Sequence, residues 1–269
     1  MLLIVFTILS LGLSVLTYYL IGLFNQSPWF LFLLIAFYFG YMAVLTAVYW
    51  FGLVILALPY KGKEMKKVNM FFFFNIRVLA GFTLFINFVF VKKKNFKELP
   101  KEPGLVLFNH VSNYDFMTVE KCMGGKYAFI GKKELKKRPM TGQLTSAIGT
   151  LFVDRGNPES SHIMVDNAVE YITQKNTSIC IAPEGTRSRN GIIGPFKHGG
   201  FHIALRSKCP ITLLCLKGME KASLRKGLKP CKVELVLLEV ISPETYENMT
   251  AGQLAEYCEQ KYKKFLNQL

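Results

Sequence analysis

The chain has 269 residues, with 33 Lys and Arg against 18 Asp and Glu, and 51% of its residues are hydrophobic. Residues 1–60 contain no charged side chain and no histidine, so the formal charge of +15 resides entirely in the remainder. This segregation excludes an ordinary soluble globule, and 23 Phe with 12 Tyr exclude a disordered chain. The charged part, residues 61–269, is long enough for one sizeable domain, or two small ones, with a proper core.

Two apolar runs open the chain. The first, residues 2–24, is long enough to cross a hydrocarbon core of about 30 Å as a helix. A cleaved signal peptide is the alternative, but no Lys or Arg precedes the run and no cleavage-site pattern follows it. Turn-forming residues at 25–28 lead into a second run over 29–60. We therefore expect a transmembrane helical hairpin over residues 1–67, whose longer second helix tilts, bends near Gly40 or emerges along the surface.

A third apolar stretch, residues 68–91, has basic residues on both sides. Four lysines precede it and four follow it: Lys61, Lys63, Lys66 and Lys67, then Lys92, Lys93, Lys94 and Lys97. Because positive charge marks the cytosolic side of a membrane segment, a third crossing would place one cluster on the wrong side. We therefore favour an interfacial or re-entrant segment over residues 68–97, with a third crossing as the alternative. The N-terminus and the domain at 98–269 would then both face the cytosol.

The cysteines and aspartates of the chain indicate whether it could bind a metal ion and which cellular compartment suits it. The six cysteines show no C-x-x-C pair and no zinc-ligand spacing, and several lie in apolar, strand-like runs. With only three Asp in the chain, no carboxylate cluster is available for a catalytic metal. We expect buried, inert thiols in a reducing compartment and no metal site.

Beyond residue 100, short apolar runs alternate with longer amphipathic segments. This alternation predicts an α/β domain with a mixed, largely parallel sheet flanked by helices. Strands are expected at 104–108, 127–130, 151–153, 178–182, 211–216 and 232–240, and helices at 114–123, 158–175 and 251–268. The last helix opens with Thr250 and Gln253, which have the spacing of a capping box.

Polar residues follow three of the expected strands directly. Asn109 and His110 follow the first strand, Asp154 and Arg155 follow the third, and residues 183–187 follow the fourth. The carboxyl ends of parallel strands share one edge of a sheet, and ligands of open α/β sheets bind there. The sequence therefore predicts a functional site at this edge.

His110 and Asp115 form an H-x-x-x-x-D pattern. An imidazole can take a proton from a hydroxyl near neutral pH, and a carboxylate can hold the required tautomer. The alternative is purely local, with Ser112 and Asp115 capping the next helix and His110 bonded to backbone. No G-x-S-x-G elbow and no Cys–His signature occurs, so direct activation of a substrate hydroxyl is favoured over a covalent enzyme intermediate.

Cations near the same edge suit a phosphate group. Arg155, Arg187, Arg189 and Lys197 could form charge-assisted hydrogen bonds with it, and Gly185 lets the backbone approach an anion closely. For Arg189 and Lys197, an ordinary solvated surface charge is the alternative.

Four blocks of sequence carry a resemblance. The strings NHVSNYD (109–115), GTLFVDR (149–155) and PEGTRS (183–188), and the apolar stretch after Pro210, resemble in order and spacing the blocks of the glycerolipid acyltransferases, in particular bacterial 1-acyl-sn-glycerol-3-phosphate acyltransferases. The likeness covers about residues 95–220. It departs from the family at Ala182, where Phe is common, and in lacking a second proline in the fourth block, which bears on acceptor and acyl-chain selectivity.

The resemblance implies an O-acyltransferase that moves a fatty acyl chain from acyl carrier protein or coenzyme A to the sn-2 hydroxyl of 1-acyl-glycerol 3-phosphate, giving phosphatidic acid. It makes His110 the base and Asp115 its orienting partner. Five further residues would handle the phosphate and glycerol of the acceptor: Arg155, Glu184, Gly185, Thr186 and Arg187. We expect no cofactor beyond the acyl thioester, membrane lipids as partners, and a multi-pass protein of the cell membrane with its catalytic domain on the cytosolic face.

Three other functions remain open at this point. The same chemistry could act on glycerol 3-phosphate, another lysophospholipid or a glycolipid. A catalytically silent lipid-binding protein would keep the fold but would have no need of the His110–Asp115 pair. A nucleic-acid binder would explain the charge, but the lysines cluster beside apolar segments and no nucleic-acid motif is present, so we expect no nucleic-acid partner.

Overall fold

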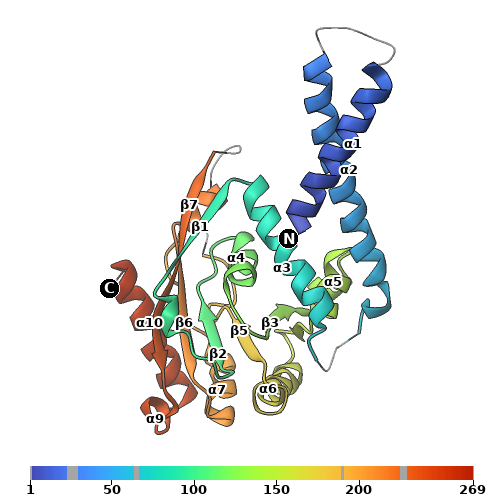
Figure 1. Ribbon diagram of the computed structural model, residues 1–269. Coiled ribbons are helices and arrows are strands. Elements are labelled where there is room, and N and C mark those ends of the chain that lie inside the picture. Colours follow the sequence, from blue (N-terminus) through green and yellow to red (C-terminus); the bar gives the residue numbers. More distant parts are fainter. Residues whose placement is uncertain (1, 23–29, 64–66, 189–190, 225–228, 269) are drawn as a thin grey trace. The chain divides into compact units, whose positions relative to one another are not determined.

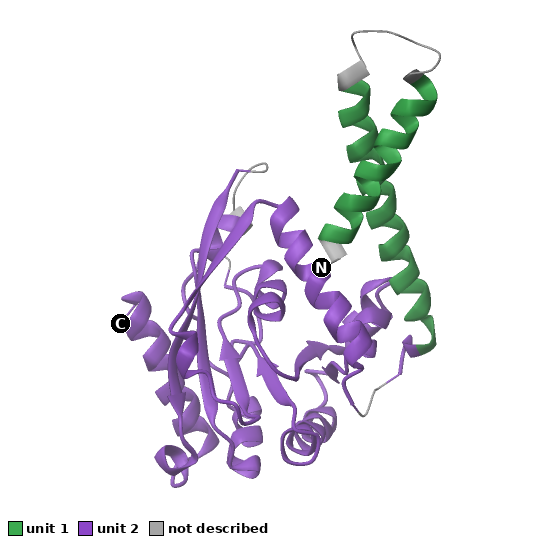
Figure 2. Cartoon of the chain, in the orientation of Figure 1, with its two compact units in different colours: residues 1–59 green, residues 60–269 purple. Residues whose placement is uncertain are grey.

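The computed structural model describes residues 2–22, 30–63, 67–188, 191–224 and 229–268. The chain divides into two compact units, Met1–Pro59 and Tyr60–Leu269 (Figure 2). The turn expected at 25–28 lies outside the described residues.

Unit 1 consists of two long apolar helices, α1 (Leu2–Gly22) and α2 (Phe30–Leu56). They pack against each other, with a hydrogen bond of 2.7 Å between the hydroxyls of Thr17 and Tyr41 and an edge-on contact between the rings of Phe6 and Tyr49. Both helices are long and apolar enough to cross a membrane. The two apolar helices expected for the hairpin are present, and that they span a membrane stays a prediction.

Unit 2 is built on one seven-stranded sheet with the order β1-β7-β6-β2-β5-β3-β4. Every pair of neighbouring strands is parallel except β6 and β7. The mixed, largely parallel sheet predicted from the sequence is confirmed. The strands are β1 (Val89–Lys94), β2 (Leu105–Phe108), β3 (Tyr127–Lys132), β4 (Leu151–Val153), β5 (Ser178–Ile181), β6 (Ile211–Lys217) and β7 (Cys231–Ile241).

Helices cover both faces of this sheet. Figure 1 shows α10 on one side of the sheet and α3 and α4 on the other. The helices of unit 2 are α3 (Met70–Ile86), α4 (Tyr114–Cys122), α5 (Thr141–Ala147), α6 (Pro158–Thr173), α7 (His202–Ser207), α8 (Met219–Leu224), α9 (Pro243–Tyr246) and α10 (Ala251–Leu266). The capping box expected at Thr250 and Gln253 is present and begins α10.

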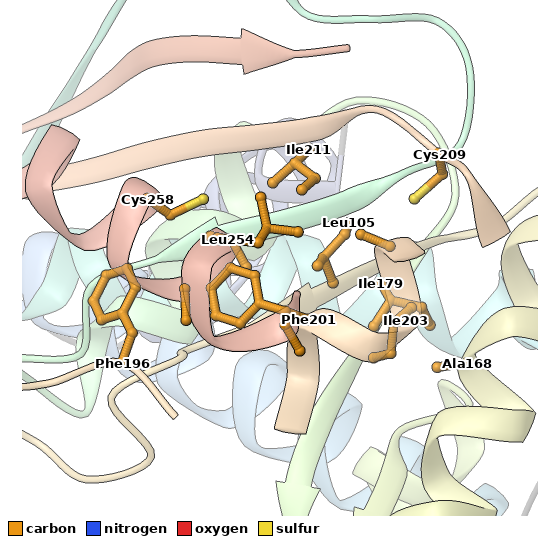
Figure 3. Close-up of a cluster of buried hydrophobic side chains, with 14 of the residues drawn as sticks. Leu105, Ala168, Ile179, Phe196, Phe201, Ile203, Cys209, Ile211, Leu254 and Cys258 are labelled. Carbon is orange, nitrogen blue, oxygen red and sulfur yellow. The ribbon is translucent and has the colours of Figure 1, made fainter. Parts of the chain in front are cut away.

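The main core lies between the sheet and α6, α7 and α10 (Figure 3). Leu105 of β2, Ile203 of α7 and Leu254 of α10 are fully buried there. Successive side chains of a strand point to opposite faces, so Phe108 of β2 belongs to the other layer, where its ring packs edge-on against Phe116 of α4. The sheet is therefore apolar on both faces, and polar side chains gather at its edges.

Residues 68–97 differ from the sequence-based expectation, because they form a helix and a strand of unit 2. The side chain of Asn69 accepts a hydrogen bond from the N–H of Phe71 and caps α3. The inner face of α3 is buried, and Phe73 packs on Tyr127 of β3 with 4.8 Å between ring centroids. Strand β1 then joins the edge of the sheet beside β7. That the exposed face of α3 lies at a membrane surface stays a prediction.

Candidate active site

The polar residues at the strand ends meet at the carboxyl edge of the parallel sheet. Asn109 exchanges two hydrogen bonds with the backbone of Leu216, at 3.2 Å and 2.7 Å, and so ties the exit of β2 to the end of β6. Both Asn109 and Glu184 are buried. The loop after β2 is therefore held firmly on the side of β6.

The loop after β2 is held on its other side by Glu184, which follows β5. Oε1 of Glu184 accepts from the main-chain N–H of His110 at 2.8 Å, and Oε2 accepts from that of Gly194 at 3.2 Å. Burial raises the pKa of Glu184, and the two backbone hydrogen bonds oppose that rise. The carboxylate therefore holds two loops together and is not turned toward solvent.

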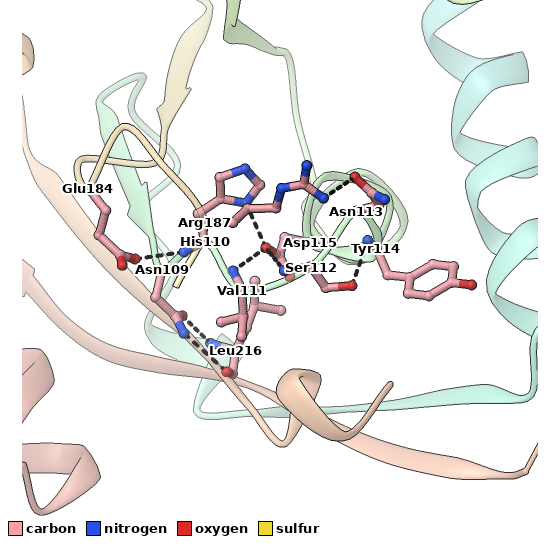
Figure 4. A network of polar contacts seen from close by, with 10 residues as sticks. All are labelled: Asn109, His110, Val111, Ser112, Asn113, Tyr114, Asp115, Glu184, Arg187 and Leu216. Atoms are coloured by element: carbon pink, nitrogen blue, oxygen red, sulfur yellow. Dashed lines mark hydrogen bonds and ion pairs between the residues drawn. The ribbon is translucent and has the colours of Figure 1, made fainter. Parts of the chain in front are cut away.

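His110 and Asp115 are in direct contact (Figure 4). Nδ1 of His110 lies 2.8 Å from Oδ2 of Asp115, and the same oxygen accepts from the main-chain N–H groups of Val111 and Ser112. Burial raises the pKa of Asp115, while the hydrogen bond with His110 and those from the backbone lower it. Asp115 therefore both holds the backbone that precedes α4 and contacts the His110 ring. With Nδ1 occupied, Nε2 is the nitrogen left for a substrate hydroxyl.

The ring of His110 is also supported by an aromatic neighbour. Phe116 packs edge-on against it with 5.3 Å between ring centroids, and Phe116 in turn packs against Phe108 and Phe129 of the sheet. The imidazole keeps a side-chain exposure of 17%, whereas Asp115 has none. This leaves a partly exposed imidazole supported by a buried carboxyl group, an arrangement that general-base catalysis can use.

The turn after β5 depends on Gly185. Its φ is +72°, a conformation that favours glycine, and a Cβ at this position would come within 3.1 Å of the Lys197 side chain. A guanidinium N–H of Arg155, from the end of β4, donates to the carbonyl of Gly185. Two cations thus approach one glycine from different elements.

A cavity of about 600 Å³ lies between this turn and the loop at 194–199. Arg187, Lys197 and His198 bring cationic or protonatable groups to its wall, and Thr186 and Ser188 bring hydroxyls. His110 is bonded to the turn that forms this wall, since its carbonyl accepts from the N–H of Ser188 at 2.8 Å. The cavity therefore lies against the turn that is bonded to the backbone of His110, and its wall carries several cationic or hydroxyl side chains.

Arg187 is positioned by the first turn after the histidine, because its Nη1 donates to Oδ1 of Asn113 at 2.7 Å. The residues expected at the site thus converge: His110 and Asp115 as a pair, Glu184 and Gly185 in the turn, Thr186 and Arg187 at the cavity, and Arg155 through Gly185. Arg189 lies outside the described residues. Asn109 was expected at this edge but given no role of its own, and no role was expected for Asn113 or His198.

The six cysteines are all in the described part of the chain, are buried, and are joined by no disulfide. Among the described residues, no three His, Cys, Asp or Glu side chains lie together so that they could hold a metal.

Comparison with known proteins identifies the fold and the family. A family model described as Acyltransferase matches residues 87–217. The 1-acyl-sn-glycerol-3-phosphate acyltransferase of Haemophilus influenzae is 32% identical over 167 residues, which are 62% of this chain and 69% of that protein. The chain belongs to this acyltransferase family. The resemblance in the sequence blocks is thereby confirmed, and the protein is an O-acyltransferase.

One further relative is similar in sequence, and one solved structure is similar in fold. The protein of the same name from Limnanthes douglasii is 28% identical over 228 residues, covering 85% of this chain and 79% of the plant protein. The crystal structure of the 1-acyl-sn-glycerophosphate acyltransferase PlsC from Thermotoga maritima aligns with a TM-score of 0.60 at 23% identity, over 72% of this chain and 78% of that one. This structural likeness shows the fold.

Proposed function

We propose that the protein transfers a fatty acyl chain from an acyl thioester to the sn-2 hydroxyl of 1-acyl-glycerol 3-phosphate and so forms phosphatidic acid. The observation that carries this proposal is the His110–Asp115 pair beside a cavity lined by Arg187 and Lys197. A hydroxyl and a phosphate on one small molecule would meet the base and the cations together. The names of the similar acyltransferases point to the same acceptor.

The chemistry uses His110 as base and then as acid. Nε2 takes the proton of the acceptor hydroxyl while its oxygen attacks the thioester carbonyl. As the tetrahedral intermediate collapses, the carbon–sulfur bond breaks and the imidazolium returns the proton to the departing thiolate. The carboxylate of Asp115 stabilises the imidazolium in between. The acyl thioester and the acceptor together supply every atom of the ester and the thiol, so the proposed reaction involves no cofactor or metal.

The acceptor's phosphate would bind in the cavity. Arg187 offers a planar, charge-assisted donor pair that Asn113 keeps in place. Lys197 adds a second cation, and Thr186 adds a hydroxyl donor. Arg155 shapes the site through the Gly185 carbonyl. Glu184 contributes by holding the two loops together, and both of its carboxylate oxygens are engaged in doing so.

The reaction would take place at a membrane, because both lipids of the reaction have acyl chains that belong in a bilayer. Helices α1 and α2 would span it as an anchor, with unit 2 on the cytosolic face of a multi-pass protein of the cell membrane. On α3, Phe71, Phe74 and Phe85 are more than half exposed on the outer face. Exposed aromatic residues between two lysine clusters suit an interfacial helix, so α3 would lie against the lipid headgroups.

Mass spectrometry of the lipid product tests the proposal. Purified protein in vesicles would receive one acyl thioester and, in separate reactions, lysophosphatidic acid, glycerol 3-phosphate, lysophosphatidylethanolamine and a glycolipid. We expect phosphatidic acid from the first acceptor and little product from the others. Preferred acylation of an acceptor without a phosphate monoester would contradict the assignment of the cavity.

A further inference from the structure

A second cluster of cations lies on the loop after β3. Residues 132–138, here called the basic loop, contain four Lys, one Arg and a single Glu. Two of the lysines have intramolecular contacts: Lys133 lies 3.3 Å from the carboxylate of Asp154, and Lys136 lies over the ring of Phe152. The side chains of Lys132, Lys137 and Arg138 are exposed and form no ion pair or hydrogen bond within the part of the chain that the structure describes.

The basic loop lies at the catalytic edge of the sheet. Strand β3 is parallel to β5 and β2, so the loop leaves at the end where His110 lies. Two strand spacings separate β3 from β2, which is about 10 Å across the sheet. Contacts also connect the two places: Lys133 pairs with Asp154, and the adjacent Arg155 donates to Gly185 in the turn that is bonded to His110.

The loop is rigidly built. Residues 133–137 form a 3₁₀-helix that ends with a hydrogen bond from the N–H of Arg138 to the carbonyl of Leu135. Gly142 packs so closely behind it that a Cβ there would lie 2.5 Å from the carbonyl oxygen of Lys136. The exposed cations are therefore presented on a fixed platform, which lowers the entropy lost on binding a partner.

The chemistry of the reaction indicates the partner. The cavity already provides cations for the acceptor's phosphate, so a separate cluster at the same edge fits the second substrate. At about 2 Å per residue, the 3₁₀-helix spreads the exposed charges over about 10 Å, which is wide for one phosphate and suits an acidic protein surface. We propose that the basic loop docks the acidic face of an acyl carrier protein, whose phosphopantetheine arm then reaches His110 with the thioester. This inference rests on the proposed function.

Charge reversal at Lys137 and Arg138 tests the docking surface. The variant Lys137→Glu/Arg138→Glu would be compared with Lys101→Glu/Lys126→Glu, which makes the same change of charge at two exposed lysines on the opposite, amino edge of the sheet. Steady-state kinetics would be measured with the same acyl chain on acyl carrier protein and on coenzyme A. We expect KM for the carrier-protein substrate to rise about tenfold or more in the first variant, with kcat little changed.

Comparing the two acyl donors distinguishes a loss of carrier-protein docking from a general loss of activity. For the basic-loop variant, KM for acyl-coenzyme A should stay within about twofold of wild type, which also shows that the variant is folded. The tenfold difference between wild type and variant should shrink as salt is raised, because exposed charges are screened. The control variant should keep the wild-type KM for both donors.

Several results would overturn the inference. Equal losses with both donors, equal losses in the control variant, or a wild-type enzyme that uses acyl-coenzyme A but not acyl carrier protein would each do so. Reduced binding of the basic-loop variant to vesicles of anionic lipid, with unchanged KM for acyl carrier protein, would assign the loop to the membrane. If neither donor yields phosphatidic acid, the proposed function itself fails. A fluorescence anisotropy titration with labelled acyl carrier protein would then still decide the docking, since wild type should bind more tightly than the variant.

Discussion

The main-chain N–H of His110 donates to Oε1 of Glu184 at 2.8 Å, although the two residues are 74 positions apart in the chain. His110 is therefore fixed twice, through its ring by Asp115 and through its backbone by Glu184. The second oxygen of Glu184 accepts from Gly194, which follows the turn that forms the cavity. One buried carboxylate thus sets the position of His110 relative to the cavity.

Replacing Glu184 by Gln should weaken this link. The amide oxygen can accept one of the two N–H groups, but the amide nitrogen then faces the other, which is left unsatisfied. We expect the free energy of unfolding to fall by about 1–3 kcal/mol. We also expect kcat to fall about tenfold, because the imidazole shifts relative to the acceptor. Thermal unfolding and steady-state kinetics would measure both, with Glu247→Gln at an exposed position as the control.

His110→Ala should reduce kcat by about 10²- to 10⁴-fold while the protein still folds, since general-base catalysis contributes that much. Asp115→Asn should also be impaired: its amide oxygen can replace Oδ2 as acceptor for Val111, Ser112 and Nδ1, but the negative charge that stabilises the imidazolium is lost. Single-turnover acyl transfer would be measured, with His162→Ala on the exposed face of α6 as the control. Near wild-type transfer by His110→Ala would exclude the mechanism.

Arg187→Ala should raise KM for lysophosphatidic acid by about tenfold or more and leave KM for the thioester nearly unchanged, because one charge-assisted contact to the phosphate is lost. Lys197→Met should act in the same direction, since Lys197 lines the same cavity. Arg206→Ala is a suitable control, because Arg206 pairs with Asp166 outside the cavity. Equal changes in both Michaelis constants would contradict a phosphate-binding role.

The sequence predicted six of the seven strands because each is a short apolar run. Strand β1 was missed because three of its six residues are lysines, which pointed to a membrane flank and not to an edge strand. Charged residues are, however, common on exposed edges, where they discourage pairing with another chain. The helices α5, α7, α8 and α9 have at most seven residues, too few to show a helical period.

At the site, the sequence predicted contacts between residues that are close in the chain and missed contacts between residues that are far apart in it. His110 and Asp115 are five positions apart, so their contact could be inferred from spacing and chemistry. The tie between His110 and Glu184 depends on the packing of β2 beside β5, which a sequence pattern does not specify. Lys197 could equally have been a surface charge. The main-chain bond from its N–H to the Pro183 carbonyl places it over Gly185, and a sequence pattern does not predict that bond.

A buried carboxyl outside the site predicts a pH dependence of stability. Glu120 of α4 is 3% exposed, and neither of its carboxylate oxygens has a hydrogen-bond partner among the described residues. Burial raises the pKa of Glu120 from 4.5 to about 8, and Arg77 of α3 opposes the rise. The folded protein therefore holds this proton more tightly than the unfolded chain, and the free energy of unfolding falls as pH rises from about 4.5 to about 8.

Glu120→Gln should remove most of this dependence. We expect the variant and the wild type to have similar melting temperatures near pH 5, and the variant to be more stable by roughly 3–4 kcal/mol at pH 8.5. Thermal unfolding in detergent at several pH values would measure the difference. Parallel curves for the two proteins would show that Glu120 is ionised throughout this range.

The membrane topology can be tested at the two ends of α3. Lys63 precedes this helix and Lys97 follows β1, and both belong to the unit that contains the catalytic pair. Because Phe73 of α3 is buried against Tyr127 of the sheet, moving α3 across the bilayer would require it to leave the core. Arg77 adds an insertion cost of about 2.5–3.5 kcal/mol near the centre of a crossing. We therefore expect Lys63 and Lys97 to lie on the same, cytosolic side.

Labelling of Lys63→Cys and Lys97→Cys with an impermeant maleimide would show their sides. The six native cysteines are buried, so they can remain in place, and unmodified protein controls for their reactivity. Both variants should be labelled only after the cells are permeabilised. Labelling of one variant in intact cells and of the other only after permeabilisation would mean that α3 crosses the membrane. In that case α3 could not pack on the sheet, and another segment would have to cover the side of α4 that α3 now contacts.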